Sequence, residues 1–232
     1  GRVEIGKKEA WQERVKNSNA ETTLIPYLKS RGVDRLDKLV LTHTDTDHMG
    51  DMLELAKHFS IREIYVSKGS MTQADFVDKL KKMKAKVHVV EVGDRLPIFD
   101  SALEVLYPLT QGDGGNDDSI VLYGEFYRTK FLFTGDLEAP GEGQMVTAYP
   151  DLRVDVLKAG HHGSKGSSSP EFLEHIKPKL ALISAGKNNR YQHPHQETLE
   201  RFEKIQTKIL RTDEQGAIRF KGWNSWQIET VR

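Results

Sequence analysis

Hydrophobic positions in the first half of the chain follow two different spacings in turn. Short segments rich in apolar residues, with the length of strands, occur at 36–41, 61–66 and 87–92. Between them, 49–59 and 72–83 place apolar residues three and four positions apart, which is the spacing of an amphipathic helix. Strands that alternate with helices in this way predict a layered α/β architecture.

The second half of the sequence is richer in strand patterns. Residues 96–107 are typical of two strands separated by a turn, and 119–124 and 130–134 have the spacing of a hairpin. Ser169-Pro170-Glu171 combines a cap, an early proline and an acid, and so predicts a helix start. The other expected elements are an edge strand at 2–5, a helix from about 18 to 29, strands at 154–157 and 180–184, a helix at 197–205, and closing strands at 209–210, 217–220 and 225–228.

Composition excludes several classes of protein. Lys plus Arg equal Asp plus Glu at 34 each, so the net charge does not indicate a strongly basic nucleic-acid binder. The absence of cysteine excludes a disulfide framework and thiolate ligands. No apolar run approaches the roughly 18 to 20 residues that span a bilayer, and no signal peptide is expected. Without repeats or linkers, 1–232 are expected to form one domain, a soluble piece of any membrane-bound parent.

The strand expected at 36–41 leads into four side chains of metal-ligand type, namely His43, Asp45, Asp47 and His48. Residues two apart in an extended segment point the same way, whereas Asp47 and His48 can share a site only if the chain turns. Imidazole together with carboxylate suits zinc or manganese. A solvated polar turn after the strand is the alternative interpretation.

Two other strand ends carry residues of the same kind. Asp136 follows Gly135 directly after an apolar strand. Aspartate is a poor strand former, so it does not serve the strand itself. Its alternative role is to cap a turn. His161 and His162 follow the strand expected at 154–157. Adjacent histidines are seldom a packing choice, because a buried imidazole needs a partner on each nitrogen. We therefore expect at least one of the two to be functional.

These motifs resemble the metallo-β-lactamase superfamily, whose signature is His-x-His-x-Asp-His, with Asp45 in place of the second histidine. That variant looks like the C-terminal domain of the ComEC competence proteins. Asp136 matches the superfamily's bridging aspartate, His161 matches its late histidine ligand, and Asn116 stands where its middle histidine is expected. The resemblance runs from about 24 to 220 and includes the segments 26–32, 116–119, 157–164, 184–188, 191–194 and 211–216.

The resemblance implies an α/β fold of the metallo-β-lactamase-like αββα type, with two departures. The family opens with Asp-Val-Gly-Gln-Gly-Asp and later Asp-Gly-Gly, and neither occurs here, so the first strands are expected to be missing, truncated or supplied elsewhere. Asp45 and Asn116 in place of histidines make the site richer in oxygen, which favours Mn²⁺ or Mg²⁺ over Zn²⁺. The same change leaves open a first metal position that is weak or empty.

Roles for individual residues also follow from the resemblance. The expected ligands of two divalent ions are His43 and Asp45 at the first, Asp47, His48 and His161 at the second, and Asp136 between them. The expected catalytic residues are Asp47, His162 and His193, and the two histidines are candidates to protonate the leaving oxygen or hold a phosphate oxygen. The expected substrate-binding residues are Asn116, Ser164, Lys165, Lys187, Arg190 and Tyr191.

Some of these residues have plainer interpretations. Phosphate contacts position a strand without reading its sequence, and an aromatic ring can stack on a base, which is the role expected of Tyr191. Lys165 and Arg190 are equally explained as surface residues, and His193 as a structural loop residue beside Pro194.

The activity implied by the resemblance is a metal-dependent nuclease that degrades the non-transported DNA strand during natural transformation. The implied context is the extracytoplasmic side of a cell-membrane protein, beside a membrane-embedded DNA channel and other competence proteins, with single- or double-stranded DNA as substrate. The residues alone indicate only a metal-dependent hydrolase. Two alternatives stay open: a hydrolase of the same fold acting on a lactone, thioester or phosphocholine ester, and a non-catalytic DNA-binding module whose metal site has decayed.

Overall fold

The computed structural model describes residues 18–222 and 226–231, and the edge strand expected at 2–5 lies outside them. Three parallel strands form the first sheet, in the order β1-β2-β3. Along β2, Ile64 and Val66 pack against the helices of this half, while Tyr65 between them faces the second sheet. This is the two-residue alternation that a strand requires. The three strands are β1 (Arg35–Val40), β2 (Ser60–Ser67) and β3 (Lys86–Val90).

Seven strands form the second sheet, in the order β10-β9-β8-β7-β6-β5-β4. Neighbours are antiparallel from β4 to β7 and parallel from β7 to β10. Parallel neighbours need a crossover connection, and a helix supplies each one here. The strands are β4 (Arg95–Ile98), β5 (Ser101–Tyr107), β6 (Val121–Phe126), β7 (Thr129–Phe133), β8 (Val156–Lys158), β9 (Leu180–Ile183) and β10 (Lys208–Arg211).

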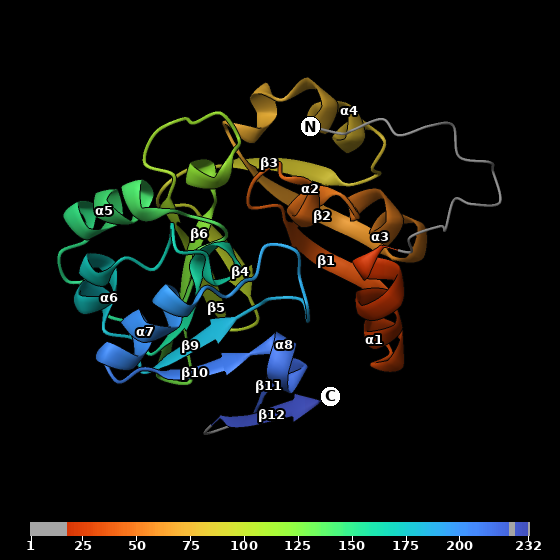
Figure 1. The fold of residues 1–232 in the computed structure, drawn as a ribbon. Helices are drawn as coiled ribbons and strands as arrows, with labels where there is room; N and C mark the ends of the chain where they lie inside the picture. The colour runs from red at the N-terminus through yellow and green to blue at the C-terminus, as the bar shows by residue number, and fades with distance from the viewer. Residues whose placement is uncertain (1–17, 223–225, 232) are drawn as a thin grey trace, which may run out of the picture.

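Helices cover the outer face of each sheet, and the two sheets pack face to face through Val40, Tyr65 and Val90 on one side and Leu96 and Val105 on the other (Figure 1). These layers confirm the predicted α/β class. The helices over the first sheet are η2 (Ala20–Leu24), α1 (Ile25–Ser30), α3 (Met52–His58) and α4 (Ala74–Lys81). Those over the second are α5 (Ala139–Ala148), α6 (Pro170–Ile176) and α7 (Gln196–Lys204).

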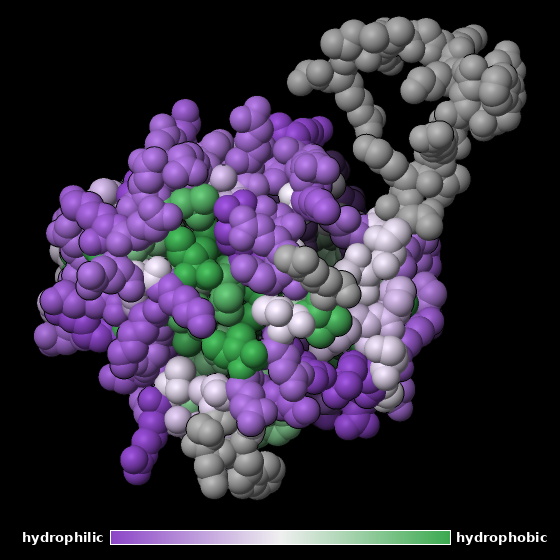
Figure 2. Space-filling view, turned by 60° about the horizontal axis from the view of Figure 1, so that its bottom comes forward, coloured by the Kyte–Doolittle hydropathy of each residue, from purple (hydrophilic) through white to green (hydrophobic). Residues whose placement is uncertain are grey.

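The face of the second sheet that points away from α5, α6 and α7 is partly open. A cavity of about 690 Å³ lies there, lined by aromatic residues that include Phe126, Phe131, Phe133 and Phe220. The hairpin of β11 (Ala217–Lys221) and β12 (Gln227–Val231) borders it. Figure 2 shows a hydrophobic band bordered by polar residues on this side of the molecule. Two expectations from the sequence stay predictions: that the family's first strands are missing, truncated or supplied elsewhere, and that the chain forms one domain.

Two helical segments differ from the sequence prediction. The helix expected at 49–59 is divided into α2 (Thr46–Met49) and α3, because Asp51 leaves helical geometry and its carboxylate accepts the N–H of Ala20. Helix α5 was not predicted, since Pro140, Gly141 and Gly143 obscure its pattern. Within the described residues, no helix is both long and apolar enough to cross a membrane.

Candidate metal centre

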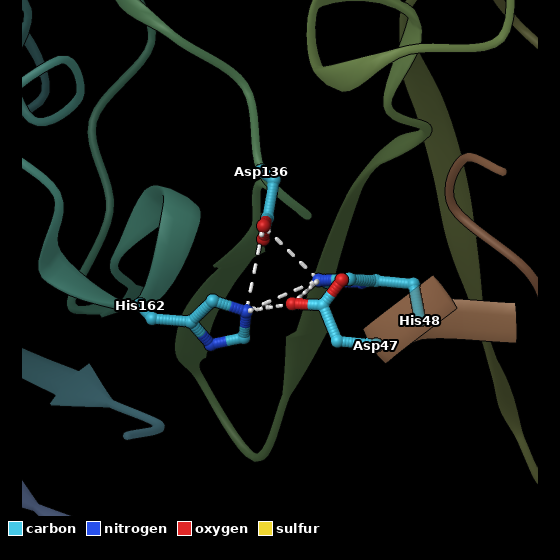
Figure 3. A group of neighbouring side chains, drawn as sticks. All are labelled: Asp47, His48, Asp136 and His162. Carbon is cyan, nitrogen blue, oxygen red and sulfur yellow. Dashed lines mark hydrogen bonds and ion pairs between the residues drawn. The ribbon is translucent and has the colours of Figure 1, made fainter. Parts of the chain in front are cut away.

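Four side chains from three separate segments converge at one edge of the two sheets. Asp47 and His48 lie on α2 after β1, Asp136 follows β7, and His162 follows β8. The ends of parallel strands meet at one edge, which is where such folds place their sites. One donor atom from each of the four lies within 4.8 Å of all the others (Figure 3). The chain therefore turns at Asp47 and His48, and both side chains reach one site. This turn is the condition that the sequence set for the two residues to share a site.

Short contacts connect the members of this group. His48 Nε2 lies 3.0 Å from Asp136 Oδ2, and His162 Nε2 lies 3.4 Å from the same oxygen. The distance from His162 Nε2 to Asp47 Oδ2 is 3.3 Å, and the two Nε2 atoms are 3.2 Å apart. A pair of facing ring nitrogens needs a proton or a cation between them, because two lone pairs repel. The cluster can therefore hold a divalent cation.

Hydrogen bonds at Nδ1 orient both imidazoles. His162 Nδ1 lies 2.7 Å from the carbonyl oxygen of Ser184 and must donate to it, so the neutral ring leaves Nε2 unprotonated toward the cluster. His48 Nδ1 lies 3.3 Å from the hydroxyl of Thr42. The hydrogen bond with Asp47 raises the pKa of His162. The same bond lowers the pKa of Asp47 to about 2, so Asp47 is ionised at neutral pH.

The turn that carries the two adjacent histidines has an unusual backbone. His161, His162 and Gly163 all have positive φ angles, of 42°, 55° and 80°. For a residue other than glycine this conformation costs about 1–3 kcal/mol, and it persists only where the surroundings impose it. At Gly163 a Cβ atom would lie 2.5 Å from Cβ of Pro194, so only glycine is compatible there. The strained turn holds His162 in the cluster.

Asp136 is almost fully buried, with 1% of its surface exposed. Burial alone works to raise its pKa, but the hydrogen bond with His48 and the charge of Lys158 hold the pKa well below the usual range. Lys158 Nζ donates to the carbonyl of Gly135 at 2.7 Å and lies 3.6 Å from Asp136 Oδ1. Burial lowers the pKa of Lys158. Sequence reasoning missed Lys158; its only signal is a single cation at the end of an apolar strand.

A second set of donors lies beside the cluster. His43 is fully buried, its Nε2 has no hydrogen-bond partner among the described residues, and that atom lies 3.9 Å from Asp45 Oδ2. Burial, followed by nearby His48, lowers the pKa of His43 to about 4, so the ring is neutral at pH 7. The ring centroids of His43 and His48 are 4.1 Å apart. A neutral buried imidazole with an unpartnered nitrogen is compatible with a ligand at the first position.

Hydroxyl groups support these donors from behind. Ser119 Oγ accepts the N–H of Asp136 at 3.0 Å and lies 3.2 Å from His43 Nδ1. Thr42 Oγ1 lies 3.1 Å from the same Nδ1 and also reaches His48. Ser119 therefore links two expected ligands that come from different sheets. The sequence offered no reason to select it beyond its place after Asn116-Asp117-Asp118.

His161 and His193 lie next to the four-residue group without belonging to it. His161 Nδ1 contacts Glu138 Oε1 at 2.9 Å, and its Nε2 lies 3.9 Å from Asp136 Oδ2. The rings of His161 and His193 have centroids 5.5 Å apart. Burial lowers the pKa of His193 to about 4. The late histidine that the structure brings into the cluster is thus His162, with His161 behind it.

The expected substrate-binding residues divide by exposure. Lys165, Lys187, Arg190 and Tyr191 are exposed on the loops that follow β8 and β9. Ser164 is largely buried, and its main-chain oxygen accepts a hydrogen bond from Thr198. The side-chain oxygen of Asn116 is buried and lacks a partner among the residues described.

The loop after the histidines is fixed by two charged residues that the sequence did not single out. Glu142 of α5 is buried and accepts the N–H groups of Ser168 and Ser169, and burial raises its pKa. Arg201 of α7 donates to the carbonyls of Lys165 and Ser167. These bonds connect the helical layer to the turn that presents His162.

Comparison with known proteins identifies the class. The family model described as the metallo-beta-lactamase superfamily matches residues 6–187, and the chain belongs to this superfamily. The protein YhfI from Bacillus subtilis, which has a metallo-beta-lactamase fold, aligns with a TM-score of 0.54 at 12% identity, covering 84% of this chain and 80% of that one. This likeness concerns the fold alone.

Within the superfamily, the chain is a domain homologous to the ComEC competence proteins. It is 39% identical over 218 residues to ComE operon protein 3 of Bacillus subtilis (strain 168), covering 92% of this chain and 28% of that protein. It is 36% identical over 203 residues to Competence protein ComA of Neisseria gonorrhoeae, covering 87% of this chain and 27% of that protein. The chain thus spans about a quarter of the length of these relatives.

Proposed function

We propose that this domain is a divalent-metal-dependent nuclease that hydrolyses DNA phosphodiesters, with Mn²⁺ as its preferred ion. The observation that carries the proposal is the convergence of two carboxylates and two imidazoles within 4.8 Å. When bound there, a divalent cation supplies Lewis-acid activation of water and of a phosphoryl oxygen. Without cysteine, and with Asp45 and Asn116 in place of histidines, the donor set favours a hard ion over zinc.

The residues proposed to hold the second ion are Asp47, His48, Asp136 and His162. His43 and Asp45 are proposed for the first, weaker position, with Asp136 shared. His162 thereby takes the ligand role that the resemblance assigned to His161. His161 is proposed instead to pass a proton to the leaving oxygen, because the 2.9 Å contact of its Nδ1 with Glu138 Oε1 orients the ring with Nε2 toward Asp136.

The surroundings support an anionic polymer as substrate. Lys165, Lys187 and Arg190 are exposed on the loops beside the cluster and can contact phosphates. The aromatic cavity near Phe131 is lined by Leu182 of β9 but, among the described residues, by none from the loops at 159–169 and 184–195. It therefore gives little support to a small apolar ester held by those loops. One relative is named Competence protein ComA, and DNA is the polyanion that fits this context.

A decayed site agrees less well with the burial of Asp136. This residue is almost fully buried, and its Oδ1 has no hydrogen-bond partner among the described residues, which costs free energy unless a bound cation contacts that oxygen. We place the domain, as part of this proposal, on the extracytoplasmic side of the membrane. There it would act with the membrane-embedded channel and other competence proteins on the strand that is not taken up.

The test is DNA cleavage by metal-stripped protein after addition of Mn²⁺, Mg²⁺ or Zn²⁺, on linear single- and double-stranded substrates. Asp136→Asn is expected to abolish cleavage. Asp155→Asn is the matched control, because Asp155 accepts the N–H of Lys130 away from the cluster and is expected to leave cleavage intact. If a lactone, thioester or phosphocholine ester is hydrolysed and DNA is not, the alternative hydrolase is correct. DNA binding without any hydrolysis supports the decayed module.

A further inference from the structure

A row of three rings leads from the metal centre to the surface of the protein. His162, a member of the cluster, lies 6.3 Å from His193 between ring centroids, with an interplanar angle of 21°. His193 lies 5.7 Å from Tyr191, with an angle of 24°. Successive planes are therefore close to parallel. Tyr191 ends the row with 55% of its surface exposed.

The loop that carries the outer rings is fixed by its own hydrogen bonds. The side-chain oxygen of Asn189 accepts the N–H of His193 at 2.9 Å, and its amide donates to the carbonyls of Gly186 and His193. His195 Nδ1 accepts the N–H of Lys165, which ties this loop to the one after β8. The rings are thus held relative to the cluster, and a ligand that stacks on them loses less ordering free energy than on a mobile loop.

Positive charge accompanies the outermost ring. The Arg190 guanidinium carbon lies 4.6 Å from the centre of the Tyr191 ring, and a guanidinium nitrogen hydrogen-bonds to the tyrosine hydroxyl. An aromatic face with a neighbouring cation is the combination that binds a nucleotide of a single strand, with the base on the ring and the phosphate near the charge. Bases in a duplex are paired and stacked inside the helix, so they cannot reach such a ring.

We propose that Tyr191 and His193 form an aromatic stacking surface for unpaired bases next to the scissile phosphate. Single-stranded DNA is then the preferred substrate. The proposal rests on the nuclease function proposed above and adds the strandedness of the substrate and the residues that select it. A duplex is then cleaved where its end frays and offers unpaired bases.

The experiment measures binding and cleavage of a fluorescently labelled single-stranded oligonucleotide, a blunt duplex of the same sequence, and an abasic strand of the same length. Removal of one base–aromatic stack corresponds to about a 5- to 150-fold loss of affinity. Tyr191→Ala is expected to lose that factor for the single strand and almost nothing for the abasic strand, whereas Tyr191→Phe retains wild-type affinity. Tyr127→Ala is the matched control, because Tyr127 is equally exposed, at 54%, on the β6–β7 turn.

Three results overturn this inference. The first is an equal loss of affinity by Tyr191→Ala for the normal and the abasic strand, which would indicate phosphate contacts alone. The second is an equal loss of affinity in Tyr127→Ala, and the third is wild-type protein that prefers the blunt duplex. Failure of the nuclease proposal is recognised separately. In that case wild-type protein cuts none of the three substrates with any metal, whatever happens to binding.

Discussion

Replacing Ser119 with alanine is expected to weaken metal binding although Ser119 is not itself a ligand. Its hydroxyl is fully buried, accepts the N–H of Asp136 at 3.0 Å and lies 3.2 Å from His43 Nδ1. The variant removes this single atom, which serves residues on both sheets, and leaves the shape of the core nearly unchanged.

The expected magnitude follows from these two contacts. The buried N–H of Asp136 loses its acceptor, which costs about 1–3 kcal/mol of folding free energy. Of the partners that the described part of the chain offers His43 Nδ1, the hydroxyl of Thr42 at 3.1 Å is then left to orient the ring. Loss of such an outer partner lowers metal affinity about 10- to 100-fold.

Isothermal titration of the metal-stripped protein with Mn²⁺ measures the affinity, and urea unfolding measures the stability. Thr207→Val is the matched control, because Thr207 donates a buried hydrogen bond to the carbonyl of Pro178 at 2.7 Å far along the chain from the cluster. It is expected to cost similar stability and leave the affinity unchanged. Equal affinities for Ser119→Ala and Thr207→Val would refute the reasoning.

Two further predictions concern buried His43 and the turn that carries His162. The pKa of His43 falls from 6.5 to about 4 on folding, so the unfolded chain binds the proton more tightly than the folded one. The free energy of unfolding of the metal-stripped protein should therefore decrease by up to about 3 kcal/mol as the pH drops from 6.5 to 4. His43→Gln should flatten this slope in urea unfolding, and an unchanged slope would contradict the assignment. Gly163→Ala should destabilise the fold by about 1–3 kcal/mol and weaken Mn²⁺ binding, since φ is 80° and Pro194 blocks a Cβ. Gly143→Ala, where a Cβ meets nothing, should do neither in thermal unfolding and titration.

The first motif was predictable because local pattern and global fold agree there. Strand β1 ends at Val40, and His43 begins the run of ligand-type residues shortly after it; a strand end is a fixed point for a site. The position of Asp136 after β7 was predictable for the same reason. In both places one segment of sequence determines both the element and the side chain that follows it.

The choice between His161 and His162 could not be predicted from sequence. The two are adjacent, and a left-handed turn with φ of 42° and 55° decides which ring faces the cluster. The next residue, Gly163, packs against Pro194, which lies 31 residues further along the chain, so this turn depends on a contact that no local pattern announces. Ser119 and Lys158 were missed because long-range contacts define their roles, with no local pattern.

The most direct measurement of the central claim is X-ray diffraction from crystals grown with Mn²⁺, with data collected at wavelengths on both sides of the manganese absorption edge. The account predicts an anomalous peak bounded by Asp47, His48, Asp136 and His162, which is lost in crystals of Asp136→Asn. No peak at that position in well-ordered crystals at saturating Mn²⁺, or a peak held by other side chains, would contradict it.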